Sequence, residues 1–215
     1  MNASGLNLRK HLNKHMLELI LLVIFIAMSF ASSGFFTVDN ILNIFRNIAM
    51  QGIIAFGMTM VIIAGEIDLS VGSTVALSGV TTGAVTGWLA NHGGMPIEQA
   101  VIIGMVVSLV LAGLIGLFNG FILTKYKVPS FIITLAMLNV VYGAAAVMSG
   151  GFPVTTLPSW YNVLGSGEIL SIPVPAIILL LIFAIIFVVM KYTKFGRSVY
   201  AVGGNPESAR LSGIN

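Results

Sequence analysis

Long apolar runs alternate with short polar breaks along almost the whole of this chain. A helix needs about 20 apolar residues to cross the hydrocarbon core of a bilayer, which is about 30 Å thick. Six runs come close to this requirement, and they cover residues 17–36, 45–64, 71–90, 98–123, 130–148 and 173–190. The pattern therefore predicts an all-α fold, a polytopic membrane helix bundle in which residues 17–190 form a transmembrane domain of six spans.

The composition supports a membrane protein with lipid as its surroundings. Of the 215 residues, 57% are hydrophobic and only 8% are charged, whereas about a quarter of the residues in soluble proteins are charged. The basic residues gather in short clusters between apolar runs, so we expect no nucleic-acid partner. The absence of cysteine excludes a disulfide framework and a thiolate metal site. The three histidines, two of them in the tail (His11 and His15), lack metal-ligand spacing, so we expect no metal site.

The first apolar run, residues 17–36, has two interpretations. A secretory signal peptide also consists of a basic region, an apolar stretch and a small-residue cleavage site. Here Arg9, Lys10 and Lys14 precede the run, and Ser29-Phe30-Ala31 is a weak match to a cleavage site. Because that match is poor and several further apolar runs follow, an uncleaved transmembrane helix fits the sequence better.

Lysine and arginine predict the direction of the helices, because cytoplasmic loops carry an excess of both. Three basic clusters lie at residues 9–14, 125–127 and 191–210. The segment 149–172 has neither lysine nor arginine, and its Trp160 and Tyr161 are typical of a membrane interface. We therefore expect a cytoplasmic N-terminal tail at residues 1–16, an external loop at 149–172 and a cytoplasmic segment at 191–215.

The third run, residues 71–90, is polar for a membrane helix, so we expect it inside the bundle or beside a water-filled path. Small residues recur along one face of this run, and a second stripe follows on the fourth run. Helices in lipid pack closely where small residues align, so tight packing is favoured over a ligand path. The two stripes consist of Gly72, Ala76, Gly79, Gly83 and Gly87, and of Ala112, Gly116 and Gly120.

The break between the second and third runs carries two carboxylates, Glu66 and Asp68. A charge near the bilayer centre costs about 2.5 to 3.5 kcal/mol on insertion scales, so a membrane protein that carries one usually has a reason for it. One interpretation is structural: Gly65 ends the second helix, and Asp68 or Ser70 caps the third. Glu66 has no comparable capping role and lies close to the expected cytoplasmic interface.

A functional interpretation of the same break stays open. Transporters place substrate and ion sites where discontinuous helices meet near the midplane. The residues that would line such a substrate pathway are Asp68, Ser70, Ser73 and Asn119. For Asp68 the capping role is favoured, and for Asn119 a hydrogen bond to a neighbouring helix is favoured over a place on the pathway.

The segment after residue 190 predicts a short helix over residues 206–212. At 1.5 Å per residue this helix is only about 10 Å long, too short to cross a membrane. It is either inert loop structure or a contact for a soluble partner, and the second is favoured. The signals are a flexible turn at Gly203 and Gly204, an N-cap at Asn205, then Pro206, Glu207 in the first turn, Arg210 and a stop at Gly213.

Three motifs appear in the same order as in a known family. They are Gly-Met-Thr-Met-Val-Ile-Ile-Ala-Gly-Glu-Ile-Asp-Leu-Ser-Val-Gly-Ser at 57–73, Asn-Gly at 119–120 with Lys-Val-Pro-Ser-Phe-Ile-Ile-Thr-Leu at 127–135, and Phe-Gly-Arg at 195–197 with Gly-Gly-Asn-Pro at 203–206 and Arg-Leu-Ser-Gly-Ile at 210–214. From about residue 35 to the end, the chain resembles the permease subunit of bacterial ABC importers for monosaccharides, the ribose type.

The resemblance implies import across the bacterial inner membrane, driven by ATP that a partner binds and hydrolyses, with no cofactor and no catalytic residue in this chain. Two permease copies would pair with two cytoplasmic ATPase subunits and a periplasmic sugar-binding protein. Residues Gly203, Gly204, Asn205, Pro206, Glu207 and Arg210 would form the segment that docks into the ATPase. The family fold has about ten helices, so we expect this chain to be truncated after the sixth.

Two points of the sequence qualify this resemblance. Glu66 occupies a position where glycine is common in relatives, which questions a tight backbone approach there. The carboxylates also allow an alternative function, a proton-coupled secondary transporter that uses Glu66 or Asp68 as a relay. A purely structural membrane subunit is a third possibility, which the polar third run and the internal carboxylates disfavour.

Overall fold

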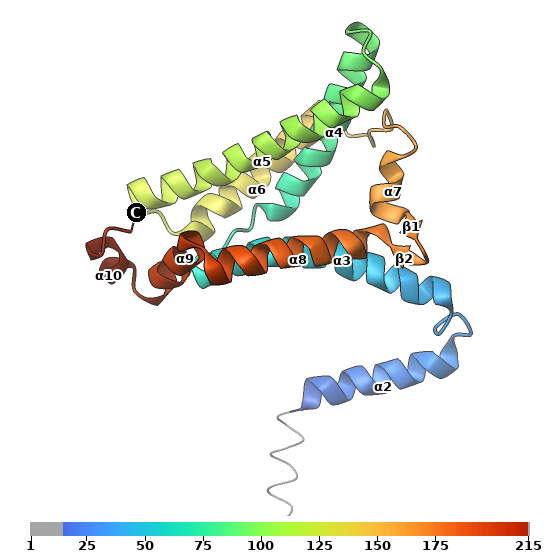
Figure 1. Ribbon diagram of the computed structural model, residues 1–215, viewed down its shortest axis with the longest axis horizontal. Helices are drawn as coiled ribbons and strands as arrows, with labels where there is room; N and C mark the ends of the chain where they lie inside the picture. The colour runs from blue at the N-terminus through green and yellow to red at the C-terminus, as the bar shows by residue number, and fades with distance from the viewer. Residues whose placement is uncertain (1–14, 215) are drawn as a thin grey trace, which may run out of the picture.

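The computed structural model describes residues 15–214 (Figure 1). The helices are α2 (Met16–Ala31), α3 (Val38–Ile63), α4 (Val71–His92), α5 (Ile97–Tyr126), α6 (Ser130–Ser149), α7 (Tyr161–Ser166), α8 (Val174–Tyr192), α9 (Lys194–Gly204) and α10 (Pro206–Leu211). Two short antiparallel strands, β1 (Glu168–Ile169) and β2 (Ile172–Pro173), form a hairpin before α8. The basic residues Arg9, Lys10 and Lys14, together with His11 and Asn215, lie outside the described residues.

The all-α prediction is confirmed, but the number of membrane spans is lower than the six that we expected. Over the part of the chain that the structure describes, four helices are long and apolar enough to cross a bilayer: α3, α5, α6 and α8. Helix α4 has 22 residues but many hydroxyl side chains, and α2 is apolar but has only 16 residues. The expected first span is shorter because α2 ends at Ala31 and the backbone becomes extended at Ser32.

Helix α4 is the centre of one group of helices, since it packs against both α5 and α6. A small core of Leu77, Val141 and Ala145 joins α4 to α6. The hydroxyls of α4 donate to carbonyl oxygens three or four residues earlier, at 2.7 to 2.9 Å; these are Ser73, Thr74, Ser78, Thr82 and Thr86. The polar helix therefore satisfies most of its hydroxyls within itself and lies inside the bundle, as its sequence predicted.

Helices α4 and α5 approach closely at Gly104. A Cβ atom at this position would stand 2.6 Å from the carbonyl oxygen of Thr82 and 2.9 Å from the Oγ1 of Thr86. One turn further along α5, Ser108 and Thr82 lie 3.0 Å apart, hydroxyl to hydroxyl. Backbone contact and an interhelical hydrogen bond thus hold the pair together, as is common in lipid.

The small-residue stripes do not form this contact. Gly83 and Gly87 lie against Val154 and Thr156 of the segment that follows α6, and the Oγ1 of Thr156 donates to the Gly83 carbonyl at 3.1 Å. A Cβ atom at the other four predicted packing glycines would meet no atom within 4 Å among the described residues; these are Gly72, Gly79, Gly116 and Gly120. A packing role for those four stays a prediction.

A second group consists of α3, α8 and α9, with α7 packed on α8 (Figure 1). The two groups lie close together where α9 is found and diverge toward α7, which lies between their far ends. Two side-chain pairs join the loop at residues 150–173 to both groups. The indole N–H of Trp160 donates to the carboxylate of Glu98 at the start of α5, and Arg46 of α3 forms an ion pair with Glu168.

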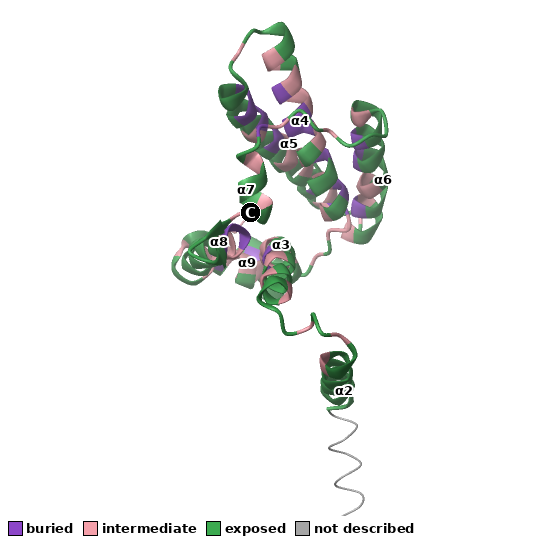
Figure 2. Cartoon of the chain, turned by 90° about the vertical axis from the view of Figure 1, so that its right-hand side faces the viewer, coloured by how far each residue is buried: buried purple, intermediate pink, exposed green. Residues whose placement is uncertain are grey.

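Helix α2 stands apart from both groups in Figures 1 and 2. None of its residues is buried. Its aromatic contact is edge-to-face, from Phe25 to Phe35 and Phe36 of the following turn, with ring centroids 5.1 and 5.8 Å apart. An apolar helix with this much exposed surface is suited to lipid rather than to water.

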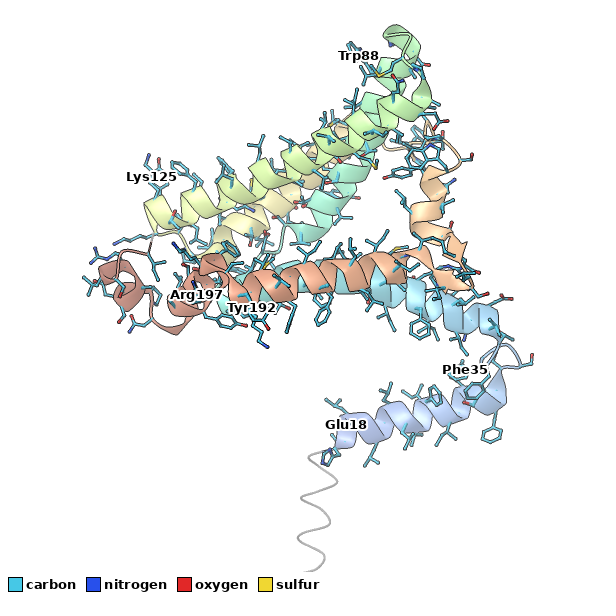
Figure 3. The ribbon with its side chains drawn as sticks, in the orientation of Figure 1. Glu18, Phe35, Trp88, Lys125, Tyr192 and Arg197 are labelled. Carbon is cyan, nitrogen blue, oxygen red and sulfur yellow. The ribbon has the colours of Figure 1, made fainter. Side chains whose placement is uncertain are left out.

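The described basic residues after α5 and after α8 share one end of the molecule, which we call the basic end. Figure 3 shows Lys125 and Arg197 at this end and Trp88 at the opposite one. The segment at residues 150–173, which contains α7 and has no lysine or arginine, lies at the far end. The lysines and arginines that follow α5 and α8 thus share one end, as the sequence predicted, whereas Arg46 lies at the far end in its ion pair with Glu168.

Candidate functional site

The break between α3 and α4 begins with a glycine that stops α3. Gly65 has a φ of 87°, which a side chain would strain. Its N–H donates to the carbonyl of Ile62 at 3.0 Å, and the N–H of Glu66 donates to that of Val61 at 3.1 Å. These two bonds form a Schellman motif, so the predicted capping role of Gly65 is confirmed.

The start of α4 differs in detail from the predicted cap. Ser70 occupies the N-cap position, but its side chain makes no capping bond to the first turn. Instead the Oδ1 of Asp68 accepts from both the N–H of Ser70, at 2.8 Å, and the hydroxyl of Ser70, at 2.5 Å. The carboxylate of Asp68 therefore accepts from a backbone N–H at the start of α4, as predicted, whereas the predicted capping bond from the side chain of Ser70 is absent.

Asn119 extends this pair into a chain of three side chains. Its Nδ2 donates to the Oγ of Ser70 at 3.1 Å. Because Ser70 has one hydroxyl proton and gives it to Asp68, the Asn119 amide must present its N–H to Ser70. The orientation of the amide follows, and the bond joins α5 to α4 as the favoured interpretation of Asn119 predicted.

That orientation leaves the Oδ1 of Asn119 buried with no donor among the described residues. Only 5% of the residue is exposed. An unpaired buried acceptor costs about 1 to 3 kcal/mol, so a structure that keeps one usually satisfies it with a group from outside the chain.

Ser73 completes the predicted set, because it is buried and its hydroxyl donates to the carbonyl of Ser70 at 2.8 Å. Asp68, Ser70, Ser73 and Asn119 thus meet at one point. The loop before it is fixed from α6, where the hydroxyl of Ser130 accepts from the N–H of Ile67 at 3.2 Å. We call this arrangement the junction.

Two cavities meet at the junction. One, of about 380 Å³, lies at the basic end between α3, α5, α6 and α9; it includes Glu66, Asp68, Asn119 and Thr134 in its lining. The other, of about 350 Å³, follows α4 and α5 past Thr74 and Ser78. Asp68 and Gly116 line both cavities, and open space at Gly116 agrees with the absence of any atom near its Cβ position.

Glu66 is half-buried and turns to the first cavity rather than only to the outer surface. Within residues 15–214, no three His, Asp or Glu side chains come close enough together to hold a metal ion. The chemistry that the junction offers is therefore hydrogen-bond acceptance, from two carboxylates and one amide oxygen.

The segment after α8 differs from its prediction at Gly203 and Gly204, which are helical and form the last turn of α9 instead of a flexible turn. Close packing explains the glycine at the first position. A Cβ atom on Gly203 would stand 1.7 Å from the carbonyl oxygen of Ile63, the last residue of α3. Phe195 and Val199 of the same helix line the junction cavity, so α9 connects the junction to α10.

Helix α10 forms almost as predicted, over Pro206–Leu211. The Oδ1 of Asn205 accepts from the N–H of Ser208 at 2.9 Å, which is a regular N-cap, and Gly213 ends the segment with a φ of 79°. On its exposed side, Arg210 donates to the carboxylate of Glu207 at 2.6 and 3.0 Å. This bond lowers the pKa of Glu207 from its ordinary value, with a smaller effect from Lys127, and raises the pKa of Arg210.

Comparison with known proteins places this arrangement in a family. Residues 40–215 match the family described as the permease component of the branched-chain amino acid transport system. The match covers the junction, both cavities and the α9–α10 segment.

The chain belongs to this permease family. This chain is 41% identical over 201 residues to the ribose import permease protein of Haemophilus influenzae. The matched residues make up 91% of this chain and 59% of that protein. It is 42% identical over 196 residues to the ribose import permease protein of Bacillus subtilis (90% and 58%). It is also 34% identical over 203 residues to an L-arabinose ABC transporter permease protein of Azospirillum brasilense (94% and 57%).

These relatives confirm the resemblance to ribose-type permeases, and together with the four long apolar helices they support a multi-pass membrane protein. The permease spans about three fifths of the length of the curated relatives that it matches. No solved structure matches the chain.

Two elements of the permease site were missed in the sequence. The close contact at Gly104 could have been predicted. The second stripe repeats every four residues, and Gly104 and Ser108 continue this repeat before Ala112. Helix α9 also had a signal, since Phe195, Val199 and Val202 recur with helical spacing, but the glycines at its end favoured a turn.

Proposed function

We propose that this chain is the permease subunit of an ATP-driven importer that moves a monosaccharide across the bacterial inner membrane. Its basic end faces the cytoplasm, and so does its N-terminus. The subunit works with a cytoplasmic ATPase, which binds ATP and performs hydrolysis, a periplasmic sugar-binding protein and a second permease copy. The chain itself carries no catalytic residue and binds no cofactor.

The observation that carries this proposal is the position of α9. The end of this helix packs against the last carbonyl of α3 at Gly203, its first half lines the junction cavity at Phe195 and Val199, and α10 follows directly. A force applied to α10 from the cytoplasm would reach the break between α3 and α4 through rigid helix contacts. This is the connection that an importer driven by a separate ATPase needs.

The junction supports a sugar as the cargo. Sugar hydroxyls donate hydrogen bonds, and the junction offers acceptors in Glu66, Asp68 and the unpaired Oδ1 of Asn119. No lysine, arginine or histidine lines either junction cavity among the described residues. The described lining therefore offers no cationic side chain to pair with the carboxylate of an amino acid. The sugar pathway would follow α4 and α5 through Asp68 and Gly116.

One observation favours a second function. Glu66 lines the cavity and is half-buried, and its carboxylate makes no hydrogen bond or ion pair with any other described residue. Such a carboxylate is suited to carrying a proton, as in a secondary transporter. The ATP-driven function is favoured because a proton relay gives no role to α10.

Uptake of labelled ribose into cells separates the two functions. The proton gradient is collapsed with a protonophore while internal ATP is maintained, and the initial rate is compared with that of untreated cells. We expect the rate to persist, and to disappear when ATP is depleted with the gradient intact. A rate that fails at once with the gradient, at constant ATP, would support the proton relay and contradict our proposal.

A further inference from the structure

A third cavity lies outside the junction, on the other side of α9. It has a volume of about 700 Å³ and opens between α3, α8 and α9. Its wall is apolar over most of its length and includes Phe56, Phe183 and Phe187. At the basic end this wall gives way to Lys191, Arg197 and Tyr200, and none of the residues that line the cavity is acidic.

The three polar residues at this mouth are all exposed, and two of them are cations. Arg197 has no carboxylate partner among the described residues, where the three ion pairs involve His15, Arg46 and Arg210. Lys191 lies over the rings of Phe187 and Tyr192, at 5.0 and 5.3 Å from their centroids. This contact holds the ammonium at the rim of the cavity without neutralising it.

Helix α9 fixes the second cation opposite the first. Gly196 packs against the carbonyl of Met190, with a Cβ position only 2.1 Å from that oxygen, so α9 folds tightly against the end of α8. Arg197 and Tyr200 follow on α9 and face the same cavity as Lys191. The mouth therefore combines a guanidinium, an ammonium and a phenol, all of which donate hydrogen bonds to phosphate.

We propose that this cavity is a binding site for an anionic phospholipid. One acyl chain lies along the phenylalanine wall, and the headgroup phosphate lies between Lys191, Arg197 and Tyr200. The site has the two parts that such a lipid needs, an apolar channel at membrane depth and a basic mouth at the boundary. It is separate from the junction, and it does not depend on which molecule the junction transports.

The chain contains its own control for this proposal. Lys125, at the end of α5, lies over Phe121 and Tyr126 at 4.9 and 5.6 Å from the ring centroids. This repeats the arrangement at the end of α8, with the same residue types at the same spacing. Lys125 lines neither the 700 Å³ cavity nor either junction cavity. Its loss removes the same charge from the same end but leaves the proposed site intact.

Native mass spectrometry of the purified chain in detergent tests the site. Phosphatidylglycerol and phosphatidylcholine with identical acyl chains are titrated against the wild type, Lys191→Gln, Arg197→Gln, the double variant and Lys125→Gln. We expect phosphatidylglycerol to bind the wild type more tightly than phosphatidylcholine does. Lys191→Gln and Arg197→Gln should each weaken the binding of phosphatidylglycerol about fivefold, and the double variant should weaken it about thirtyfold. These factors follow from the usual contribution of one basic side chain near an anionic surface. Phosphatidylcholine binding should not change.

Three outcomes would overturn the proposal. The first is no preference for phosphatidylglycerol in the wild type. The second is an equal loss in Lys125→Gln, which would indicate unspecific attraction to the basic end. The third is displacement of the lipid by millimolar inorganic phosphate, which would identify a site for free phosphate instead of a lipid.

Discussion

Gly203 of α9 lies against the carbonyl oxygen of Ile63, the residue that ends α3, and a Cβ atom at Gly203 would stand 1.7 Å from that oxygen. Neither a carbonyl nor a helix end can move aside as a flexible side chain can. The contact therefore requires glycine, and it ties the segment that leads to α10 to the helix whose end forms the junction.

Gly203→Ala should separate α9 from α3. Overpacking of this kind costs the packed arrangement about 1 to 3 kcal/mol. In the assembled importer we expect ATP hydrolysis to continue while sugar uptake per ATP falls. The measurement is uptake and hydrolysis in the same proteoliposomes. Gly204→Ala is the matched control, because a Cβ at that position meets no atom within 4 Å. An equal ratio of sugar uptake to ATP hydrolysis in the two variants would show that the Gly203 contact plays no part in coupling.

Asn119→Ala tests the junction as a pathway. The substitution removes one hydrogen bond to Ser70, but it also removes the unpaired Oδ1, so we expect a stability loss of about 1 kcal/mol or less. Uptake should fall far more than the amount of folded protein does. Uptake and thermal unfolding are compared with those of Asn139→Ala, whose exposed amide bonds only within α6. A fall in uptake that merely follows stability would mean that Asn119 is structural.

The ion pair on α10 predicts a pH dependence. Arg210 holds the pKa of Glu207 below its ordinary value of 4.5, so the stabilisation of α10 by this pair is complete above that value. It is lost as the pH falls through the lowered pKa. We expect Arg210→Gln to return the pKa of Glu207 toward its ordinary value, measured by carbon-13 titration of labelled glutamate in micelles. Arg197→Gln should leave the titration unchanged, and an equal effect of both would contradict the pairing.

Gly104→Ala should destabilise the contact of α4 with α5, where its Cβ would meet the Thr82 carbonyl at 2.6 Å. The expected cost is about 1 to 3 kcal/mol, and it should appear as a lower thermal unfolding midpoint in detergent. Gly113→Ala, on the same helix, has open space at the Cβ position and should unfold at or above the wild-type temperature. The reverse order would show that the helices do not meet at Gly104.

The fold was predictable where local rules decide it. Helical stops at Gly65 and Gly213 and the cap at Asn205 follow from the backbone preferences of single residues, and the structure has all three. Apolar runs also predicted the positions of the long helices, although α3 begins at Val38, seven residues before the expected run, and α2 ends at Ala31, five residues before the expected end. The run at residues 17–36 became a shorter α2 because nothing in an apolar pattern marks the extended backbone at Ser32.

Tertiary contacts were harder to predict. Glycine is typical both of a flexible turn and of a close contact between helices, so the sequence around Gly203 does not distinguish the two. Only the contact with the distant carbonyl of Ile63 shows that position 203 belongs to a helix. Asp68 accepts from the backbone N–H of Ser70 as expected, but local rules did not predict that the same oxygen also accepts from the hydroxyl of Ser70. The set at the junction was recognised because polar residues in lipid are rare, not because the spacing of Asp68 and Asn119 reveals their approach.

Cross-linking shows whether α10 contacts the ATPase, and the chain suits this measurement because it contains no cysteine. Ser208→Cys places a single thiol on the exposed face of α10, and Ser166→Cys places one on α7 at the opposite end. Each variant is treated with a thiol-to-amine cross-linker in inside-out vesicles that contain the ATPase subunit. We predict an adduct with the ATPase from Ser208→Cys and none from Ser166→Cys. No adduct from Ser208→Cys, or equal adducts from both, would contradict the account.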